Sequence, residues 1–465
     1  MNINVLVLSL ICSIALVRPL WGLTILLITE CAIFELGRYA IVQLPLGYAG
    51  TSDVFIVFLV IGTYLHAKRV GHFNPAINSY QSPPTSSTSQ VLRSAILPYL
   101  IWFVICIVIG IIWRTGEHPL TQHIRHTIIS ILPWSIAVCV WFMRDRAKEI
   151  MKMVIIVASG TAMIHIAIQL LDLRSVMYAA YWTSTSGIDE YQEYIINESD
   201  FVRGLPRGIM LMLYCQIFCF SEYLISKDSL RKNPVFLLLS LLQAMAIGIT
   251  FTRSLMAEAI AGCGVAVVLA SKLADMRNII QKKVFVAFFM GIFCLAIAIA
   301  AKPQMFDFWA ERIGQLEDDL WIFSTETVRG MDNVASLKAI SDKPLLGWGM
   351  FQYPDAYSYR EMAPTDIHPL LEMGLVGGIP CILLFIYLQW TIISKFWVNS
   401  RNDVNLHRQM LPYLTVIITT LLVINTVGAG GTDSGSGLIA MAMFIGLTAA
   451  AFENARCPII IKKIN

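Results

Sequence analysis

The stretch SDKPLLGWGMFQYPDAYSYREMAPTDIHPLLEMGLVGG, residues 341–378, differs in character from the rest of the chain. Its centre is polar and aromatic, whereas the whole chain is 57% hydrophobic and only 14% charged. Its end carries Gly374, Gly377 and Gly378 and continues into the apolar run IPCILLFIYLQW. Glycine permits tight turns and close approach of backbone segments. We therefore expect this stretch to form the lid of a groove and the start of a helix.

The composition places the chain among polytopic all-α membrane proteins. A soluble protein of this length carries roughly a quarter charged residues. Apolar runs of about 17 to 22 residues recur from end to end, long enough for helices to cross a bilayer of roughly 30 Å. We expect residues 1–465 to form a single integral membrane domain with 12 or 13 transmembrane helices. The expected spans are 4–17, 20–35, 52–66, 94–113, 127–143, 151–171, 208–225, 234–250, 255–271, 284–301, 370–394, 410–427 and 437–453. The first two are separated only by Arg18-Pro19 and form either a tight hairpin or one kinked span.

The basic residues set the expected orientation. Lys and Arg concentrate in every second loop, and the positive-inside rule makes these loops and the C-terminus cytoplasmic. These cations are Lys68, Arg69, Arg93, Arg144, Arg146, Lys148, Lys152, Lys227, Arg231, Lys232, Lys272, Arg277, Lys282, Lys283, Arg401, Arg408, Arg456, Lys462 and Lys463. The other side carries two long periplasmic loops, 172–207 and 302–368, in which acids outnumber bases by six to three and eleven to six. Long outer loops are the natural place for site residues on a membrane scaffold.

The larger outer loop is expected to carry two amphipathic helices. They lie in FDFWAERIGQLEDDLWIF and in STETVRGMDNVASLKAI, where apolar residues recur at helical spacing. In the second segment these residues are Val328, Met331, Val334, Leu337 and Ile340. Such a face suits the membrane surface or the tops of the membrane helices.

Arg253 is the sharpest single signal of function. It lies in ITFTRSLMAEA, in a very short outer loop between two apolar runs. The positive-inside rule does not predict a cation in an outer loop. A cation at such a depth is costly unless it is paired, which marks it as a functional candidate. Glu258 is a candidate partner. The alternative is an arginine that reaches the outer headgroups.

Arg203 and Arg207 lie in VRGLPRGIM, where the first outer loop returns to the membrane. Their guanidinium forks, next to two glycines and a proline, suit a phosphate clamp, because the fork binds phosphate oxygens in pairs and keeps its charge. An ordinary interfacial pair is the alternative. Together with Arg253 they fit an anionic, lipid-linked pyrophosphate held at the outer leaflet.

His368 is the candidate general base. It precedes the helix that follows the large loop, with Glu372 four residues on, and it could accept a proton from a hydroxyl group. Asp366 and Glu361 are rival bases. Tyr353 belongs to a group of outer-loop aromatics that suit either sugar faces or the interfacial aromatic belt.

Several classes of chemistry lack a signal in this sequence. The ten cysteines lie almost wholly in apolar runs and give neither a disulfide framework nor metal-ligand spacing. LEDDL at 316–320 is a weak metal motif, and there is no phosphate-binding loop or dinucleotide fingerprint. We expect no metal, no cofactor and no nucleic-acid partner.

Four segments, in order between about residues 200 and 380, resemble the O-antigen ligase and polymerase family of bacterial membrane glycosyltransferases. PLLGWGMFQY followed by LLEMGLVGG looks like the signature of that family. FVRGLPRGIML, FTRSLMAEAIAG and RGMDNVASLKAISDKPLLGWG resemble its arginine segments and its amphipathic helix. The first 190 residues agree with the family only in hydropathy.

This resemblance implies a C-type glycosyltransferase fold of about twelve helices in the bacterial inner membrane. It implies metal-independent, inverting transfer of a glycan from an undecaprenyl-pyrophosphate donor at the periplasmic face. By similarity, Arg203 and Arg253 match the arginines that hold the pyrophosphate, with Arg207 as a second candidate. The expected partners are the lipid-linked oligosaccharide, the bilayer, a chain-length regulator and export proteins.

The choice between polymerase and ligase depends on a histidine. Ligases of the family commonly carry a histidine eleven residues before the helix glycine, which is Gly374 here, and that position is Ala363. His368 lies five residues later. We therefore expect a polysaccharide polymerase, for O-antigen or exopolysaccharide. The alternatives are a ligase that joins the glycan to the lipid A core of lipopolysaccharide, and a flippase or transporter. A transporter needs ionisable residues within its spans, which here are chiefly Glu30, His165 and Glu258.

Overall fold

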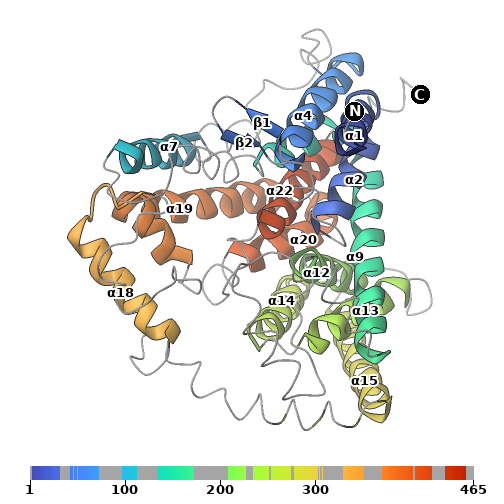
Figure 1. The fold of residues 1–465 in the computed structure, drawn as a ribbon. Helices are drawn as coiled ribbons and strands as arrows, with labels where there is room; N and C mark the ends of the chain where they lie inside the picture. The colour runs from blue at the N-terminus through green and yellow to red at the C-terminus, as the bar shows by residue number, and fades with distance from the viewer. Residues whose placement is uncertain are drawn as a thin grey trace.

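The protein is mainly helical in the part of the chain that the computed structural model describes. The described residues are 3–31, 42–44, 47–49, 51–72, 97–112, 134–171, 208–226, 234–250, 253–273, 277–301, 303, 306, 310, 328–349, 369–401, 404–421 and 435–456. The helices are α1 (Ile3–Val17), α2 (Pro19–Cys31), α4 (Thr51–Arg69), α7 (Leu97–Ile112), η2 (Arg144–Arg146), α9 (Ala147–Leu170), α12 (Ile209–Ile225), α13 (Pro234–Ile249), α14 (Arg253–Ser271), α15 (Arg277–Ala301), α18 (Val328–Asp342), α19 (Pro369–Arg401), α20 (Val404–Thr419) and α22 (Gly435–Arg456) (Figure 1). One short hairpin pairs β1 (Val42–Leu44) with β2 (Gly47–Ala49).

Each expected span overlaps a helix within the described residues. Residues 134–142, within the expected span 127–143, are also helical. The sequence therefore predicted the positions of the helices correctly, because long apolar runs satisfy their backbone groups internally only as helices in an apolar environment.

Three of the described helical segments are long and apolar enough to cross a membrane. They are Arg144–Leu170, Asn278–Ala300 and Leu370–Val398. The apolar segments of the other helices, within the described ranges, have 10–17 residues. At 1.5 Å per residue even a 17-residue helix measures about 26 Å, which is less than the roughly 30 Å of hydrocarbon core. The structure thus agrees with a membrane protein without confirming the expected number of spans.

The first two helices form a tight hairpin rather than one kinked span. The Arg18 amide donates to the Ile14 carbonyl oxygen at the end of α1, and the Arg18 carbonyl oxygen accepts the first hydrogen bonds of α2, from the amides of Trp21 and Gly22. Gly22 lies directly against Ala15, where a Cβ atom on the glycine would be 2.8 Å from the alanine Cα. A glycine at this position therefore lets α1 and α2 approach closely.

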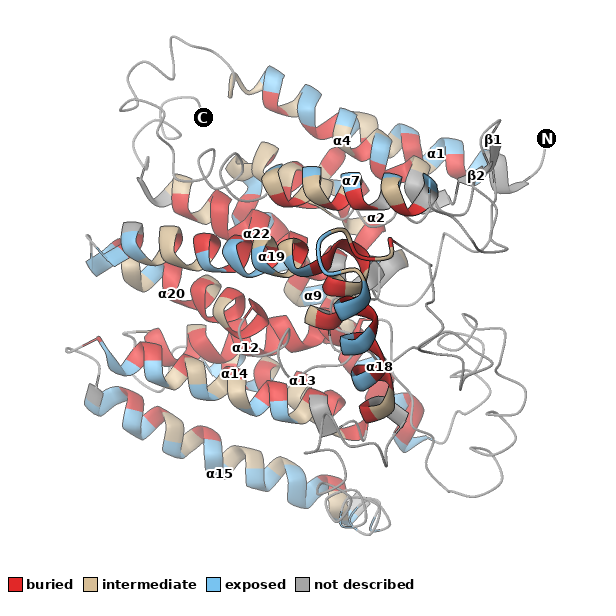
Figure 2. Cartoon of the chain, turned by 90° about the vertical axis from the view of Figure 1, so that its left-hand side faces the viewer, coloured by how far each residue is buried: buried red, intermediate tan, exposed pale blue. Residues whose placement is uncertain are grey.

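Helix α12 is the centre of the fold. All of its residues except Glu222 are buried, and α9, α13, α14, α20 and α22 pack around it. Figure 2 shows this red, buried core between peripheral helices with exposed faces, such as α4 and α15. An all-round apolar helix is stable in this position because every one of its faces meets another helix.

Helix α18 lies across the direction of most other helices and packs against α19 (Figure 2). It confirms the second expected amphipathic helix; the first, around 308–320, lies outside the described residues apart from Ala310. The exposed face carries Val334 and Leu337, as a helix on a membrane surface would. The buried face carries Ala335, Ala339 and Ile340 and also three polar residues, whose burial the sequence analysis did not predict.

The helix ends expected on the cytoplasmic side meet one another. His66 near the end of α4 lies 3.2 Å from Asp145 in η2, and Arg144 forms a 3.2 Å ion pair with Glu453 near the end of α22. The Lys272 ammonium lies 5.4 Å from the centre of the Trp397 ring. The expected cytoplasmic loops therefore gather at one end of the bundle.

Lys283 joins α15 to the end of α12. Its side chain is 2% exposed, and Nζ donates hydrogen bonds to the carbonyl oxygens of Tyr223, Leu224 and Ser226 at 2.6, 3.3 and 2.7 Å. The last carbonyls of a helix have no partner within the helix and carry a partial negative charge. The buried ammonium supplies both the missing donors and the opposite charge.

We predict that Lys283→Met lowers the free energy of unfolding by about 2–3 kcal/mol, because it leaves buried carbonyl oxygens without a donor. Thermal unfolding of the purified protein in detergent measures this. The neighbouring Lys282 is exposed, so Lys282→Met is the matched control and should leave Tm nearly unchanged. Equal Tm values for the two variants would contradict the assigned role of Lys283.

Candidate functional site

The stretch at 344–349 closes onto a break in α19. Within α19, Gly377 and Gly378 leave helical geometry, with φ of −134° and 69°. Pro380 has no amide hydrogen, so the carbonyl of Val376, four residues earlier, loses its helical donor. The Gly349 amide supplies a donor to Val376 at 3.1 Å, and the Trp348 amide supplies one to Leu375 at 2.6 Å. The turn thus replaces hydrogen bonds that the broken helix cannot make.

A third backbone bond runs in the opposite direction. The Ile379 amide donates to the Pro344 carbonyl oxygen at 2.7 Å. The turn and the break therefore pair like two short strands, and each satisfies backbone groups of the other. The expected tight turn and helix start are present, and they form one unit.

Two glycines in this unit have no substitute. Gly347 has a φ of 63°, and a Cβ atom there would lie 2.6 Å from the Leu375 carbonyl oxygen and 2.7 Å from the Gly378 amide nitrogen. Gly378 has a φ of 69°, and its Cβ would collide with the Pro344 carbonyl oxygen. Positive φ and missing space both require glycine.

Indole groups attach the unit to the neighbouring helices. Trp348 Nε1 donates to the Ala339 carbonyl oxygen of α18 at 2.8 Å, and the Lys343 ammonium lies 3.7 Å from the Trp348 ring centre. Trp102 Nε1, on α7, donates to the Gly377 carbonyl oxygen at 3.1 Å. The unit therefore joins α7, α18 and α19, which lie together on the left of Figure 1.

We predict that Gly347→Ala detaches the turn from α19 and lowers Tm by several degrees, because a strained φ and a backbone clash together cost on the order of 3 kcal/mol. Gly264→Ala is the matched control, since a Cβ there meets nothing within 4 Å and alanine favours a helix. Thermal unfolding of both variants tests the prediction. It fails if Gly347→Ala unfolds at the temperature of the unsubstituted protein.

The segment of Arg253 and the segment that follows Arg207 begin at the same end of the bundle. Helix α13 returns antiparallel along α12, and Ser240 Oγ donates to the Gln216 carbonyl oxygen. Arg253 is the first residue of α14 and follows Thr250, at the end of α13, by only three residues. The start of α14 therefore lies beside the start of α12, whose N-cap Gly208 directly follows Arg207 in the sequence.

Glu258 is buried, at 2% exposure, one and a half turns into α14. The expected pairing of Glu258 with Arg253 is not tested, because the Arg253 side chain is outside what the structure describes. Arg203, Arg207, Tyr353, Asp366 and His368 also lie outside the described residues.

The buried polar face of α18 adds residues that the sequence analysis missed. Asp332, Asn333 and Ser336 are each 0% exposed. They stand at positions i, i+1 and i+4, so they lie close together on the helix, with the exposed Val334 on the other side. The sequence MDNVAS contains this polar spacing, which was the available signal. The prediction used only the spacing of the apolar residues.

The opposite end of the bundle carries a titratable cluster. His72 Nδ1 lies 3.1 Å from the Phe142 carbonyl oxygen, and its Nε2 lies 3.9 Å from Asp145. Burial, followed by the positive charge of Arg144, lowers the pKa of His72 to about 4. The folded protein therefore holds this imidazole neutral, with Nδ1–H donating to the carbonyl.

We predict that acidification from pH 6.5 to pH 4 destabilises the fold partly through His72. Below its ordinary pKa of about 6.5 the unfolded residue takes up a proton that the folded residue does not, so the free energy of unfolding falls as the pH falls through this window. His72→Gln keeps a hydrogen-bond donor but cannot titrate, and it should flatten the pH dependence of Tm. An unchanged slope between pH 6.5 and pH 4 would contradict this.

In the described part of the chain, no group of three or more His, Cys, Asp or Glu side chains is arranged to hold a metal ion. The cysteines Cys215 and Cys219, four residues apart on α12, are fully buried core residues. A scan of the chain against protein-family models found no match, and a search of curated proteins found none either. Functional inference therefore depends on the residues themselves and on the motif resemblance.

Proposed function

We propose that the protein is a polysaccharide polymerase of the bacterial inner membrane, with about twelve spans and its site facing the periplasm. The observation that carries this proposal is the unit of the Gly-rich turn and the broken α19. PLLGWG and LLEMGLVGG, which resemble the ligase and polymerase family, pair with each other through backbone hydrogen bonds. The two motifs, about 30 residues apart, satisfy each other's backbone groups. This contact supports the family resemblance better than two separate motif matches would.

In the proposed reaction, a hydroxyl group of one lipid-linked repeat unit attacks the anomeric carbon of another. A new C–O bond forms there with inversion, the bond to the pyrophosphate oxygen breaks, and undecaprenyl pyrophosphate leaves. The hydroxyl proton passes to a base, for which His368 and Asp366 are the candidates. Tyr353 and its aromatic neighbours would contact the sugars.

The arginines carry the largest share of the proposed catalysis. Negative charge develops on the leaving pyrophosphate, and preorganised cations stabilise it most strongly where water is excluded. Arg253 is the first residue of α14, which begins beside the start of α12. Arg207 directly precedes Gly208, the N-cap of α12. The N-termini of two neighbouring helices add partial positive charge at the same end, which favours an anionic group there.

Helix α18 lies beside the Gly-rich unit, because it packs against α19. Its residues Asp332, Asn333 and Ser336 are each 0% exposed and therefore do not line the proposed glycan groove.

We predict that deleting the protein collapses the ladder of surface glycans to single repeat units, and that Arg253→Ala reproduces the collapse. Loss of one preorganised charge donor typically costs about 100- to 1000-fold in rate. The measurement is a gel of surface and lipid-linked glycans from the deletion strain carrying each variant. Arg69→Ala, which removes an exposed arginine at the opposite end, is the control and should restore the full ladder.

Two results would overturn the proposal. Long polymer that forms but stays on the undecaprenyl carrier would identify a ligase. An unchanged ladder in the deletion strain would remove both glycosyltransferase functions and favour a transporter, whose buried ionisable residues would include His165 and Glu258.

A further inference from the structure

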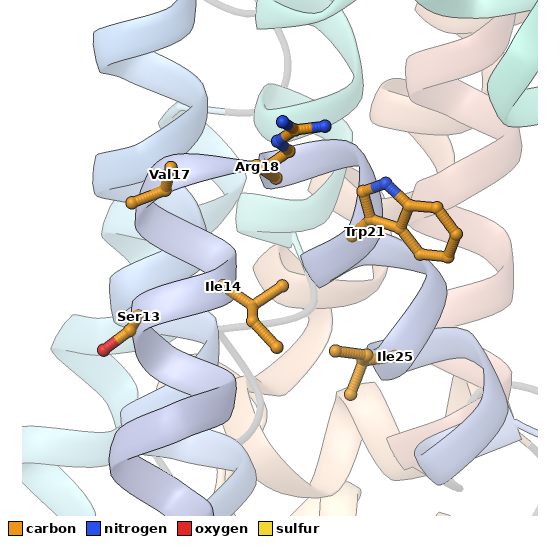
Figure 3. Close-up of a pocket in the computed structure, with 6 residues that line it drawn as sticks. All are labelled: Ser13, Ile14, Val17, Arg18, Trp21 and Ile25. Carbon is orange, nitrogen blue, oxygen red and sulfur yellow. The ribbon is translucent and has the colours of Figure 1, made fainter.

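The α1–α2 hairpin contains a groove of about 450 Å³ between its two helices. It is lined by Ser13, Ile14, Val17, Arg18, Trp21 and Ile25. Figure 3 shows Arg18 and Trp21 at the turn end of the hairpin, with Ile14 and Ile25 further down between the helices. The groove is therefore an apolar channel with one cation and one indole at a single end.

The charged end of this groove lies on the side of Lys68 and Arg69. Gly62 of α4 packs against Ala15, three residues before the hairpin turn, and is seven residues before the end of α4. Seven residues of helix measure about 10 Å, so the turn is near the basic end of α4. A long arginine side chain can extend several ångströms further, which brings the Arg18 guanidinium to the level of phospholipid headgroups.

Among the residues that the structure describes, no other group covers this end of the groove. Val17 and Trp21 are 68% and 60% exposed, and the Arg18 side chain is exposed too. Within the described ranges, no acidic side chain forms an ion pair with Arg18. Exposed arginine and tryptophan next to each other are typical of the boundary between headgroups and acyl chains.

A second groove provides an internal comparison. It lies between α9 and α13, has a volume of about 350 Å³, and is lined by Met163, Ile166, Ala167, Leu170, Leu171, Leu242 and Met245. All seven side chains are apolar, so this groove can accept an acyl chain but cannot distinguish one headgroup from another.

We propose that the α1–α2 groove is a binding site for an anionic phospholipid of the leaflet nearest Lys68 and Arg69. One acyl chain lies between α1 and α2 against Ile14 and Ile25. The phosphate accepts hydrogen bonds from the Arg18 guanidinium, and the Trp21 ring covers the glycerol region. The site is independent of the proposed glycosyltransferase function, because it uses none of the residues assigned to that reaction.

Native mass spectrometry of the full chain in detergent tests the site by titration with dioleoyl phosphatidylglycerol and with dioleoyl phosphatidylcholine. The unsubstituted protein should bind phosphatidylglycerol more tightly. Arg18→Gln should weaken phosphatidylglycerol binding about fivefold, since one cation near a membrane surface contributes about 1 kcal/mol. Arg69→Gln makes the same charge change at an exposed position outside the groove and should have a smaller effect.

A second pair of variants tests the acyl-chain part of the site. Ser13→Phe fills the α1–α2 groove and should abolish the preference for phosphatidylglycerol, whereas Ala167→Phe fills the apolar groove between α9 and α13 and should preserve it. Equal binding of the two lipids, or equal losses in Arg18→Gln and Arg69→Gln, would overturn the proposal. Tighter binding of a polyprenyl phosphate than of phosphatidylglycerol would also overturn it and reassign the groove to a carrier lipid.

Discussion

The backbone pairing between the 344–349 turn and the break in α19 is the constraint on which the candidate site depends. Pro380 removes the donor for the Val376 carbonyl, and a buried carbonyl without a donor costs roughly 1–3 kcal/mol. The amides of Trp348 and Gly349 meet that need only if the turn lies directly against the helix. This in turn requires glycine at 347 and 378, where side chains would collide.

The consequences extend beyond the turn itself. Because Lys343 and Pro344 directly follow α18, anchoring the turn also fixes the end of that helix against α19. The Trp102 indole then connects α7 to the same break. The anchoring holds α18 with a mixed face inward. Ala335, Ala339 and Ile340 are buried on it together with the polar Asp332, Asn333 and Ser336.

The rest of the bundle supplies a rigid frame with two different ends. One end gathers the starts of α12 and α14, where Arg253 opens a helix beside a neighbouring helix N-terminus. The other end is fastened by ion pairs and by Lys283, which caps α12 from α15. The buried α12 connects the two ends.

The sequence by itself determined where the helices lie, because a long apolar run specifies a helix through local composition alone. It also determined that glycines would be required near the start of α19, and the positions of its cations distinguished the basic end of the bundle from the other end.

The pairing of the turn with the break was decided only by the tertiary structure. Hydropathy does not record which freed carbonyl meets which amide 27 residues away, although Pro380, two residues after Gly378, indicated a break. The choice between a hairpin and a kinked span at Arg18-Pro19 was likewise a matter of packing, settled by the contact of Gly22 with Ala15. The inward polar face of α18 depended on its neighbours as well, since a helix with two usable faces is oriented by what it packs against.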